Sequence, residues 1–167
     1  LTRKGFDYAL ALVKSYPGCS IHASLPCTPW STWARMNLKK LGNKFRTKLI
    51  ANRKKSLLML RYFLTVAHHV ISNGGHISFE WPRYCDGWKI PTLNNFISKY
   101  GLKEVNFDGC ALGLTSSKGN PIKKPWKIIS SSPRIINNFS ALICDGSHTH
   151  DICQGSDTLK SGFYNEY

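Results

Sequence analysis

Apolar residues recur along this chain at two spacings, one typical of amphipathic helices and one of short buried strands. The helical spacing predicts a first helix over residues 2–14 and a longer one over residues 47–72, which Asn73-Gly74-Gly75 would end. Pro91 suits the first turn of a further helix that reaches Tyr100. The stripe expected to be buried on the longer helix consists of Leu49, Leu57, Leu60, Leu64 and Ile71.

Four short apolar runs predict strands, over residues 19–24, 76–80, 102–107 and 126–129. Strands that alternate with helices are typical of an α/β layer fold. A long helix separates the first two strands, and such a unit nearly always forms a right-handed crossover, so we expect these strands to be parallel neighbours. The last two strands are close enough for an antiparallel hairpin. The expected fold is therefore a mostly parallel sheet with an antiparallel hairpin near the C-terminus.

The composition fits a folded chain of about one domain. Its 167 residues are 42% hydrophobic and 19% charged, which allows a core and excludes disorder throughout. No uninterrupted apolar run reaches the ~18–20 residues of a membrane span, and no signal peptide is recognisable. The six cysteines lack the spacing of a secreted disulfide scaffold, so we expect free thiols and an intracellular location. Because the chain starts at Leu1 rather than Met, we expect a longer polypeptide.

Positive charge dominates and is concentrated in one stretch. The 23 Lys and Arg exceed the 9 Asp and Glu by 14, which favours a polyanionic partner, most often nucleic acid. Residues 35–55 contain no acidic residue, and we expect a phosphate-facing loop and helix start there; the alternative is a solvated helix face. The nine basic residues of this stretch are Arg35, Lys39, Lys40, Lys44, Arg46, Lys48, Arg53, Lys54 and Lys55. A second basic patch includes Lys123, Lys124 and Lys127.

Cys27 is the first candidate for chemistry. It lies between Pro26 and Pro29, in a loop that directly follows the first predicted strand. Ligands of open α/β sheets bind at the carboxyl ends of strands. A rigidly placed cysteine in basic surroundings suits a nucleophile, because the thiolate is the reactive form. The alternative is a packed structural cysteine.

Glu80 is the second candidate, at the end of the second predicted strand. It is the only acidic residue between Asp7 and Asp86, and a lone carboxylate at the end of a buried strand is costly unless it has a partner or a role. Such a carboxyl group could bind the polar edge of a base or act as a general acid. The alternative is a structural ion pair with Arg83 or another cation.

Three motifs together resemble the cytosine-C5 DNA methyltransferases. Pro26-Cys27-x-x-Trp30-Ser31 resembles their catalytic Pro-Cys loop, and Phe79-Glu80-Trp81-Pro82 falls where they carry Glu-Asn-Val. The run from Pro121 to Lys127 lies where they carry Gln-x-Arg-x-Arg. The similarity covers roughly residues 19–130. The chain also resembles methyltransferase-like segments of eukaryotic mobile-element polyproteins, which share motifs like Phe-Glu-Trp-Pro-Arg and Lys-Lys-Pro-Trp.

The resemblance implies part of a Rossmann-like methyltransferase sheet and a role for each motif. Cys27 would attack C6 of cytosine, and Glu80 would hydrogen-bond the base and help protonate N3. C5 would then take a methyl group from S-adenosylmethionine. Lys123, Lys124 or Lys127 would support the base or the phosphates, and the base would leave the duplex, so the expected partner is DNA and the expected compartment the nucleus. The expected base pocket consists of Pro26, Trp30, Ser31, Trp81 and Arg83.

The departures from the family pattern define the competing interpretation. Thr28 replaces the Gln after Pro-Cys, Trp81 replaces the Asn after Glu, and the Gln-x-Arg-x-Arg element is missing. The glycine-rich cofactor loop and its acidic ribose ligand are also missing from the sequence, so the cofactor half would lie upstream of Leu1. The competing interpretation is a non-catalytic basic nucleic-acid-binding module of a larger polyprotein.

The C-terminal part contains a candidate metal site. Two thiols and two imidazoles within ten residues can satisfy tetrahedral zinc, although their spacing matches no standard finger. The four residues are Cys144, His148, His150 and Cys153. We expect a methyltransferase-like segment over residues 1–143 and a tail over residues 144–167 that zinc would staple without taking part in chemistry.

Overall fold

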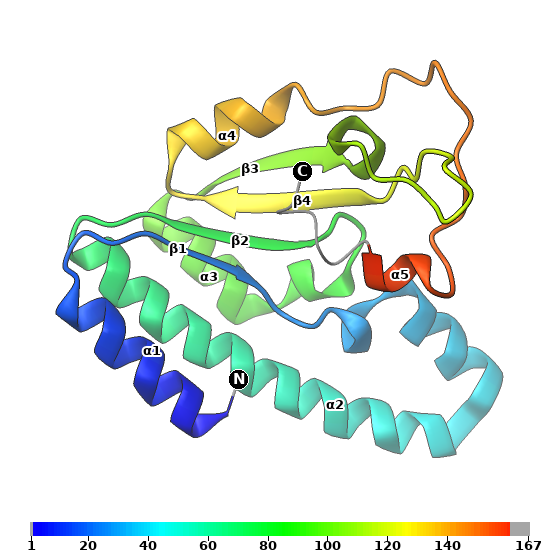
Figure 1. Cartoon of the computed structure of the whole chain (residues 1–167). Coiled ribbons are helices and arrows are strands. Elements are labelled where there is room, and N and C mark those ends of the chain that lie inside the picture. The colour runs from blue at the N-terminus through cyan, green and yellow to red at the C-terminus, as the bar shows by residue number, and fades with distance from the viewer. Residues whose placement is uncertain (1, 161–167) are drawn as a thin grey trace.

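The chain forms a mixed α/β fold around a four-stranded sheet. The computed structural model describes residues 2–160, and the strand order is β1-β2-β4-β3 (Figure 1). The strands are β1 (Ile21–Ser24), β2 (Ile77–Pro82), β3 (Lys103–Asp108) and β4 (Pro125–Ser130). Of the tail predicted over residues 144–167, positions 161–167 lie outside the described residues.

The predicted parallel pair and the predicted hairpin are both confirmed, whereas the mostly parallel sheet is wrong. β1 and β2 pair in parallel, with Ile21 opposite Ile77 and Ser24 opposite Glu80. β4 is antiparallel to both of its neighbours, β2 and β3. Because β4 reverses direction and inserts between those two strands, only one pair of neighbouring strands is parallel. The structure therefore does not support the expected Rossmann-like sheet.

The helices match the apolar pattern except at the start of the crossover helix. Helix α2 (Thr32–Ser72) begins at Thr32 and not at Thr47, so the basic stretch is helical and not a loop. Ser31 caps this helix by accepting a hydrogen bond from the Ala34 amide at 3.2 Å, and the Lys, Arg, Leu and Met that follow favour a helix. Gly42 interrupts it with φ +63°, so the helix is kinked there. The other helices are α1 (Arg3–Ser15), α3 (Pro91–Tyr100), the unpredicted α4 (Pro133–Ser140) and the short α5 (Asp157–Lys160).

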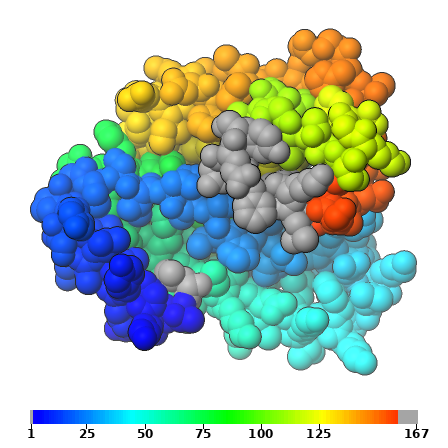
Figure 2. Space-filling model, viewed as in Figure 1, coloured from blue at the N-terminus to red at the C-terminus, as the bar shows by residue number. Residues whose placement is uncertain are grey.

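Each face of the sheet packs against its own apolar cluster. Ile77, Phe79 and Trp81 alternate along β2 and face a core shared with α1, α2 and α3. Trp126 and Ile128 of β4 face the opposite core, against which α4 packs. Figure 2 shows the blue-to-cyan N-terminal half and the yellow-to-orange C-terminal part on opposite sides. In the described part of the chain, no helix is long and apolar enough to cross a membrane.

The close packing of α2 on the sheet gives a stability test. Leu60→Ala should lower the free energy of unfolding by about 2–5 kcal/mol, because Leu60 is 1% exposed and its loss leaves a cavity. Leu58→Ala is the matched control on the same helix; Leu58 is 48% exposed, and its loss should cost less than about 0.5 kcal/mol. Urea unfolding measures both values, and equal losses would mean that α2 does not pack as described.

Candidate active site at the ends of β1 and β2

The parallel pairing of β1 and β2 brings the two candidate motifs together. Because Ser24 is opposite Glu80, the loop that leaves β1 starts beside the end of β2. The indole N–H of Trp81 donates to the carbonyl of Leu25 at 2.7 Å and ties this loop to β2. Cys27 is the N-cap of the short 3-10 helix η1 (Thr28–Trp30), and its carbonyl accepts a hydrogen bond from the Trp30 amide at 2.8 Å. The thiol is therefore held on a fixed loop.

Cys27 and Glu80 line one pocket. Its volume is about 260 Å³, and residues 24–28, residues 80–82, Lys124 and Trp126 surround it. A second cavity of about 550 Å³ shares Cys27, Lys124 and two further lining residues with the first. The Cys27 side chain therefore stands where the two hollows meet, and together they offer space for a group the size of a nucleotide.

Glu80 is a buried carboxyl group in which only one of the two oxygens accepts a hydrogen bond from the described residues. The residue is 3% exposed, and its Oε2 accepts a hydrogen bond from the Ser24 hydroxyl at 2.6 Å. Its Oε1 is buried without a hydrogen-bond partner among the described residues. Burial raises the pKa of Glu80, and the Ser24 hydroxyl and the Lys124 charge only oppose this rise. Glu80 therefore keeps a proton to higher pH than an exposed glutamate, as a general acid requires.

The charge of Glu80 acts on the neighbouring thiol. Burial is the main cause that raises the pKa of Cys27, the Glu80 carboxylate raises it further, and Lys124 lowers it. In the free protein the thiol form is therefore favoured. A ligand that neutralises the negative charge of Glu80, by donating a proton or by bringing a positive charge, would remove the second cause and favour the thiolate. The two groups are electrostatically coupled across the pocket.

The residues predicted to form the base pocket have different locations. Pro26 and Trp81 line the smaller pocket, but Trp81 is fully buried. Trp30 is buried against α2, where its indole N–H donates to the Ser56 hydroxyl at 2.8 Å. Ser31 caps α2 and lines only the larger cavity. Neither tryptophan is placed to stack on a base.

Two exposed aromatic residues beside the pocket were not predicted from the sequence. Trp33 and Tyr84 are 63% and 67% exposed, and both line the larger cavity beside Cys27. Exposed aromatic side chains next to a basic surface are suited to stacking on bases. The sequence contains no signal that separates Trp33 from the buried Trp30, because both follow the same proline-rich motif.

Arg83 does not neutralise Glu80. The acidic residues that form ion pairs among residues 2–160 are Asp7, Asp86 and Glu104. Glu80 instead accepts a hydrogen bond from the Ser24 hydroxyl. The Arg83 guanidinium instead lies 5.8 Å from the centre of the Tyr84 ring. The structural ion pair with Arg83 is therefore not formed, and the cation that acts on the pKa of Glu80 is Lys124.

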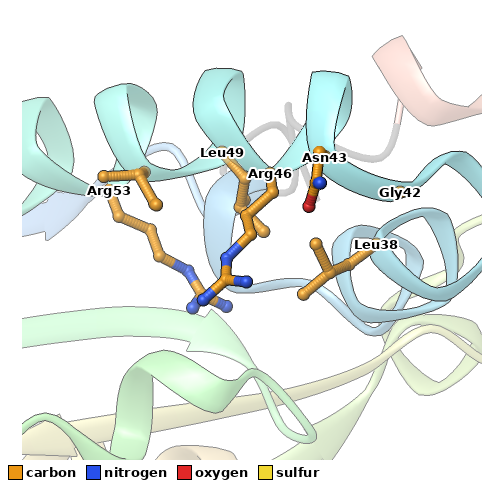
Figure 3. A pocket seen from close by; sticks show the side chains of 7 residues that line it. Leu38, Gly42, Asn43, Arg46, Leu49 and Arg53 are labelled. Atoms are coloured by element: carbon orange, nitrogen blue, oxygen red, sulfur yellow. The ribbon is translucent and has the colours of Figure 1, made fainter.

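Most of the predicted basic stretch is an exposed helical surface. Within the described residues, seven of its side chains are exposed and form no ion pair: Lys39, Lys40, Lys44, Arg46, Lys48, Lys54 and Lys55. Arg46 and Arg53 project in the same direction into a hollow of about 440 Å³ beside the Gly42 kink (Figure 3). Their two guanidinium groups form a positive site on the face that also supports the Cys27 loop.

Two arginines of the stretch have structural partners. Arg53 donates to the Pro29 carbonyl at 3.1 Å, and its guanidinium lies 4.8 Å from the centre of the Trp30 ring. Arg53 therefore holds the Cys27 loop against α2. Arg35 lies 3.7 Å from the Asp86 carboxylate. Both are poorer candidates for phosphate contacts than the exposed lysines.

The lysines around β4 also differ in position. Lys124 lines both cavities and acts on the pKa of both Cys27 and Glu80, as a residue that supports a base would. Lys123 is exposed just before it. Lys127 forms an ion pair with Glu104 at 2.8 Å and lies over the Trp88 ring, which engages it within the fold.

A Cys/His cluster contributes no lining residue to either cavity, and its membership differs from the prediction. The ligand atoms of Cys110, Cys144, His148 and His150 all lie within 4.8 Å of one another, close enough for one metal ion. Burial first, and the Cys144 thiol second, raise the pKa of Cys110 to about 11. Cys153 is not part of the cluster. Its thiol donates instead to the Asp157 carbonyl, with 3.8 Å between sulfur and oxygen. Cys110 follows β3 and is distant in sequence, so local spacing could not identify it.

Comparison with known proteins adds no relative. No family model, no curated protein and no solved structure matches this chain.

The coupling between Glu80 and Cys27 can be measured by alkylation. The Glu80 charge raises the pKa of Cys27, so Glu80→Gln should move the pH midpoint of Cys27 alkylation by iodoacetamide to lower pH. Peptide mass spectrometry can follow each cysteine separately. Cys19 lies before the opposite end of β1 and is the internal control, whose midpoint should not change between the two proteins. An unchanged Cys27 midpoint would show that the two groups are not coupled.

Proposed function

We propose that this chain carries the catalytic pocket of a cytosine-C5 methyl transfer reaction on nucleic acid, with DNA as the substrate and the nucleus as its location. The observation that carries the proposal is the shared pocket of Cys27 and Glu80 at the ends of two adjacent parallel strands. Attack on C6 of a pyrimidine is feasible only if N3 is engaged at the same time, so a nucleophile and a proton donor have to reach one ring together.

The chemistry follows from these two side chains. The Cys27 thiolate, whose proton has passed to solvent, forms a bond to C6; the C5–C6 double bond opens, and N3 gains the proton held by Glu80. C5 then takes the methyl group of the donor that an upstream segment would hold. Loss of the C5 proton to solvent and departure of the Cys27 thiolate restore the double bond, and N3 returns its proton to Glu80. The burial that raises the pKa of Glu80 supports the proton-donor role, and Lys124 supports the thiolate.

The described residues do not fit S-adenosylmethionine. The loop after β1 contains no glycine, and the loop after β2 contains one, Gly87, which packs against the Trp81 ring. The two loops that flank the pocket therefore lack the glycine-rich sequence that cradles a nucleotide-like cofactor. The proposal therefore includes an upstream segment of the same polypeptide that holds the methyl donor. β1 is at the edge of the sheet formed by the described strands, and an edge strand can pair with a further strand.

The surface around the pocket suits a nucleic-acid strand. The exposed lysines of α2 can contact phosphates, and Trp33 and Tyr84 can stack on bases next to the pocket. In a duplex, the target base has to leave the base stack to reach Cys27. In a single-stranded substrate the base is already accessible, so this step is not needed.

A second candidate function is a non-catalytic nucleic-acid-binding module. The raised pKa of Cys27 and the missing cofactor loop favour this function, because binding phosphates requires neither a thiolate nor a cofactor loop. The same basic surface of α2 would serve both functions, so reactivity at Cys27 separates them.

A cofactor-independent adduct tests the catalytic proposal. A single-stranded DNA oligonucleotide in which 2-pyrimidinone replaces cytosine lacks the exocyclic amino group, which makes C6 more electrophilic. Cys27 should add to it without a methyl donor, and the loss of ring absorbance together with the intact mass should show the adduct. Cys27→Ala should form no adduct, and Glu80→Gln should form it at least about 100-fold more slowly, because the N3 proton donor is lost.

The controls separate a specific adduct from general thiol reactivity. Cys19→Ser should form the adduct at the wild-type rate, and urea unfolding should show that Cys27→Ala is folded. If the wild-type protein forms no adduct, or Cys27→Ala forms it equally well, the catalytic proposal is wrong and the binding module takes its place.

The role of α2 in binding can be tested by the salt dependence of affinity. Replacing Lys39, Lys40, Lys44 and Lys48 by Ala should weaken binding to single-stranded DNA and reduce the slope of log K against log salt by up to about 3, at roughly 0.7 per phosphate contact. The control removes equal charge elsewhere, with Lys4, Lys14, Lys99 and Lys103 changed to Ala. Fluorescence anisotropy measures both slopes, and equal slopes for the two variants would remove α2 from the interface.

A further inference from the structure

The Cys/His cluster has the geometry of a tetrahedral metal site. The Cys144 sulfur lies 3.3 Å from Nε2 of His150 and 3.8 Å from Nε2 of His148. Zinc–sulfur bonds of about 2.3 Å and zinc–nitrogen bonds of about 2.0–2.1 Å place tetrahedral ligands about 3.3–3.8 Å apart. All four donor atoms lie within 4.8 Å of one another, so small movements close the site.

The chain around the cluster is arranged to present these ligands. The buried carboxylate of Asp108 accepts a hydrogen bond from the Cys144 amide at 3.0 Å, which fixes Cys144 beside the end of β3 and therefore beside Cys110. Gly146 has φ +78°, which turns the chain back so that its amide donates to the Cys144 sulfur at 3.4 Å. A backbone N–H directed at a ligand sulfur holds that ligand in position, as hydrogen bonds around metal sites commonly do.

The segment fixed by the cluster has little other support. Residues 141–156 form neither helix nor strand. They run around the loop at residues 116–120, where Asp151 accepts hydrogen bonds from Ser116 at 2.7 Å and Asn120 at 3.2 Å. Figure 1 shows this orange-to-red segment passing around the yellow-green loop before it reaches α5. Ile143 and Ile152 of this segment are exposed, and a segment that buries so little of its apolar surface is typical of those that a structural metal stabilises.

The same segment forms a wall of the cavity beside the nucleophile. Cys153 and Thr158 line the larger cavity together with Cys27 and Trp33. The Asp157 carboxylate accepts a hydrogen bond from the Ser117 amide at 2.9 Å, which fixes the far end of the segment. The position of this wall therefore depends on how the segment is held at both of its ends.

We propose that Cys110, Cys144, His148 and His150 bind one Zn²⁺ ion, and that the ion completes the wall of the cavity beside Cys27 by fastening residues 144–158. Two thiolates and two imidazoles are the ligand set that zinc prefers. Four protein ligands leave no open position, so the ion is structural and takes no part in chemistry. The zinc site stands independently of methyl transfer, because it rests on the cluster alone.

Metal content tests the ligand set. The full chain, loaded with Zn²⁺ and dialysed, should retain about one ion per chain by mass spectrometry, and Co²⁺ in its place should give the visible absorption of a tetrahedral thiolate site. Cys110→Ser should lose the bound ion, whereas Cys153→Ser, the matched control, should keep it. Retention by Cys110→Ser together with loss by Cys153→Ser would overturn the assignment. A Cys110–Cys144 disulfide in the protein isolated under reducing conditions would also overturn it.

Alkylation of Cys27 tests the link to the cavity and needs no nucleic acid. Removing zinc by a chelator, or by Cys110→Ser, should increase the rate at which iodoacetamide modifies Cys27, because the wall formed by residues 153–158 is released. Limited proteolysis should then cut residues 144–158 first. An unchanged rate with a zinc-free protein would show that the ion does not support the cavity. Neither readout depends on adduct formation with a pyrimidine, so this test and that of the proposed function can fail separately.

Discussion

The candidate site depends on the parallel pairing of β1 with β2. This register places Ser24 opposite Glu80, which allows the short hydrogen bond between them, and it brings the Cys27 loop to the end of the neighbouring strand. The helix between the two strands makes the pairing possible, because a parallel connection has to cross back over one face of the sheet. Trp81 then ties the loop to β2 through the Leu25 carbonyl. Without this pairing, the thiol and the carboxyl group would not share a pocket.

The alternation of side chains along β2 places the core residues on one face of the sheet and the candidate catalytic carboxyl group on the other. Ile77, Phe79 and Trp81 face the helices and form the core, whereas Glu80 points to the other face, where Lys124 and Trp126 surround it. A carboxyl group in that position is costly to bury, and its unpaired oxygen adds to the cost. The hydrogen bond from Ser24 and the charge of Lys124 offset only part of this cost, which is the arrangement expected of a group kept for a ligand.

Local patterns were sufficient to predict the four strands and the helices α1, α2 and α3, and they failed where distant segments decide the structure. The apolar spacing placed all four strands within one or two residues, and the strand–helix–strand order predicted the β1–β2 pair. It could not show that β4 inserts between β2 and β3, because strand order depends on packing across the sheet. The start of α2 was missed because the charge of residues 35–55 was given more weight than their helix propensity and the Ser31 cap.

The same limit applies to the candidate sites. Proline and strand context were enough to select Cys27 and Glu80, since each lies at the end of its own strand. Burial decides which aromatic residues can reach a ligand, and the sequence does not distinguish the buried Trp30 from the exposed Trp33. The Cys/His cluster shows the limit most clearly, because Cys110 joins it from a strand end far from the other three residues.

The central claim is that Glu80 holds a proton for a cytosine ring bound next to Cys27. Carbon-13 NMR of the Glu80 carboxyl group, followed against pH with and without a single-stranded cytidine oligonucleotide, measures this most directly. We expect a raised pKa in the free protein and a further change on binding cytidine, whose N3 accepts a proton. A thymidine oligonucleotide, whose N3 already carries one, should produce no such change. A Glu80 that titrates in the ordinary range, or that does not respond to cytidine, would contradict the claim.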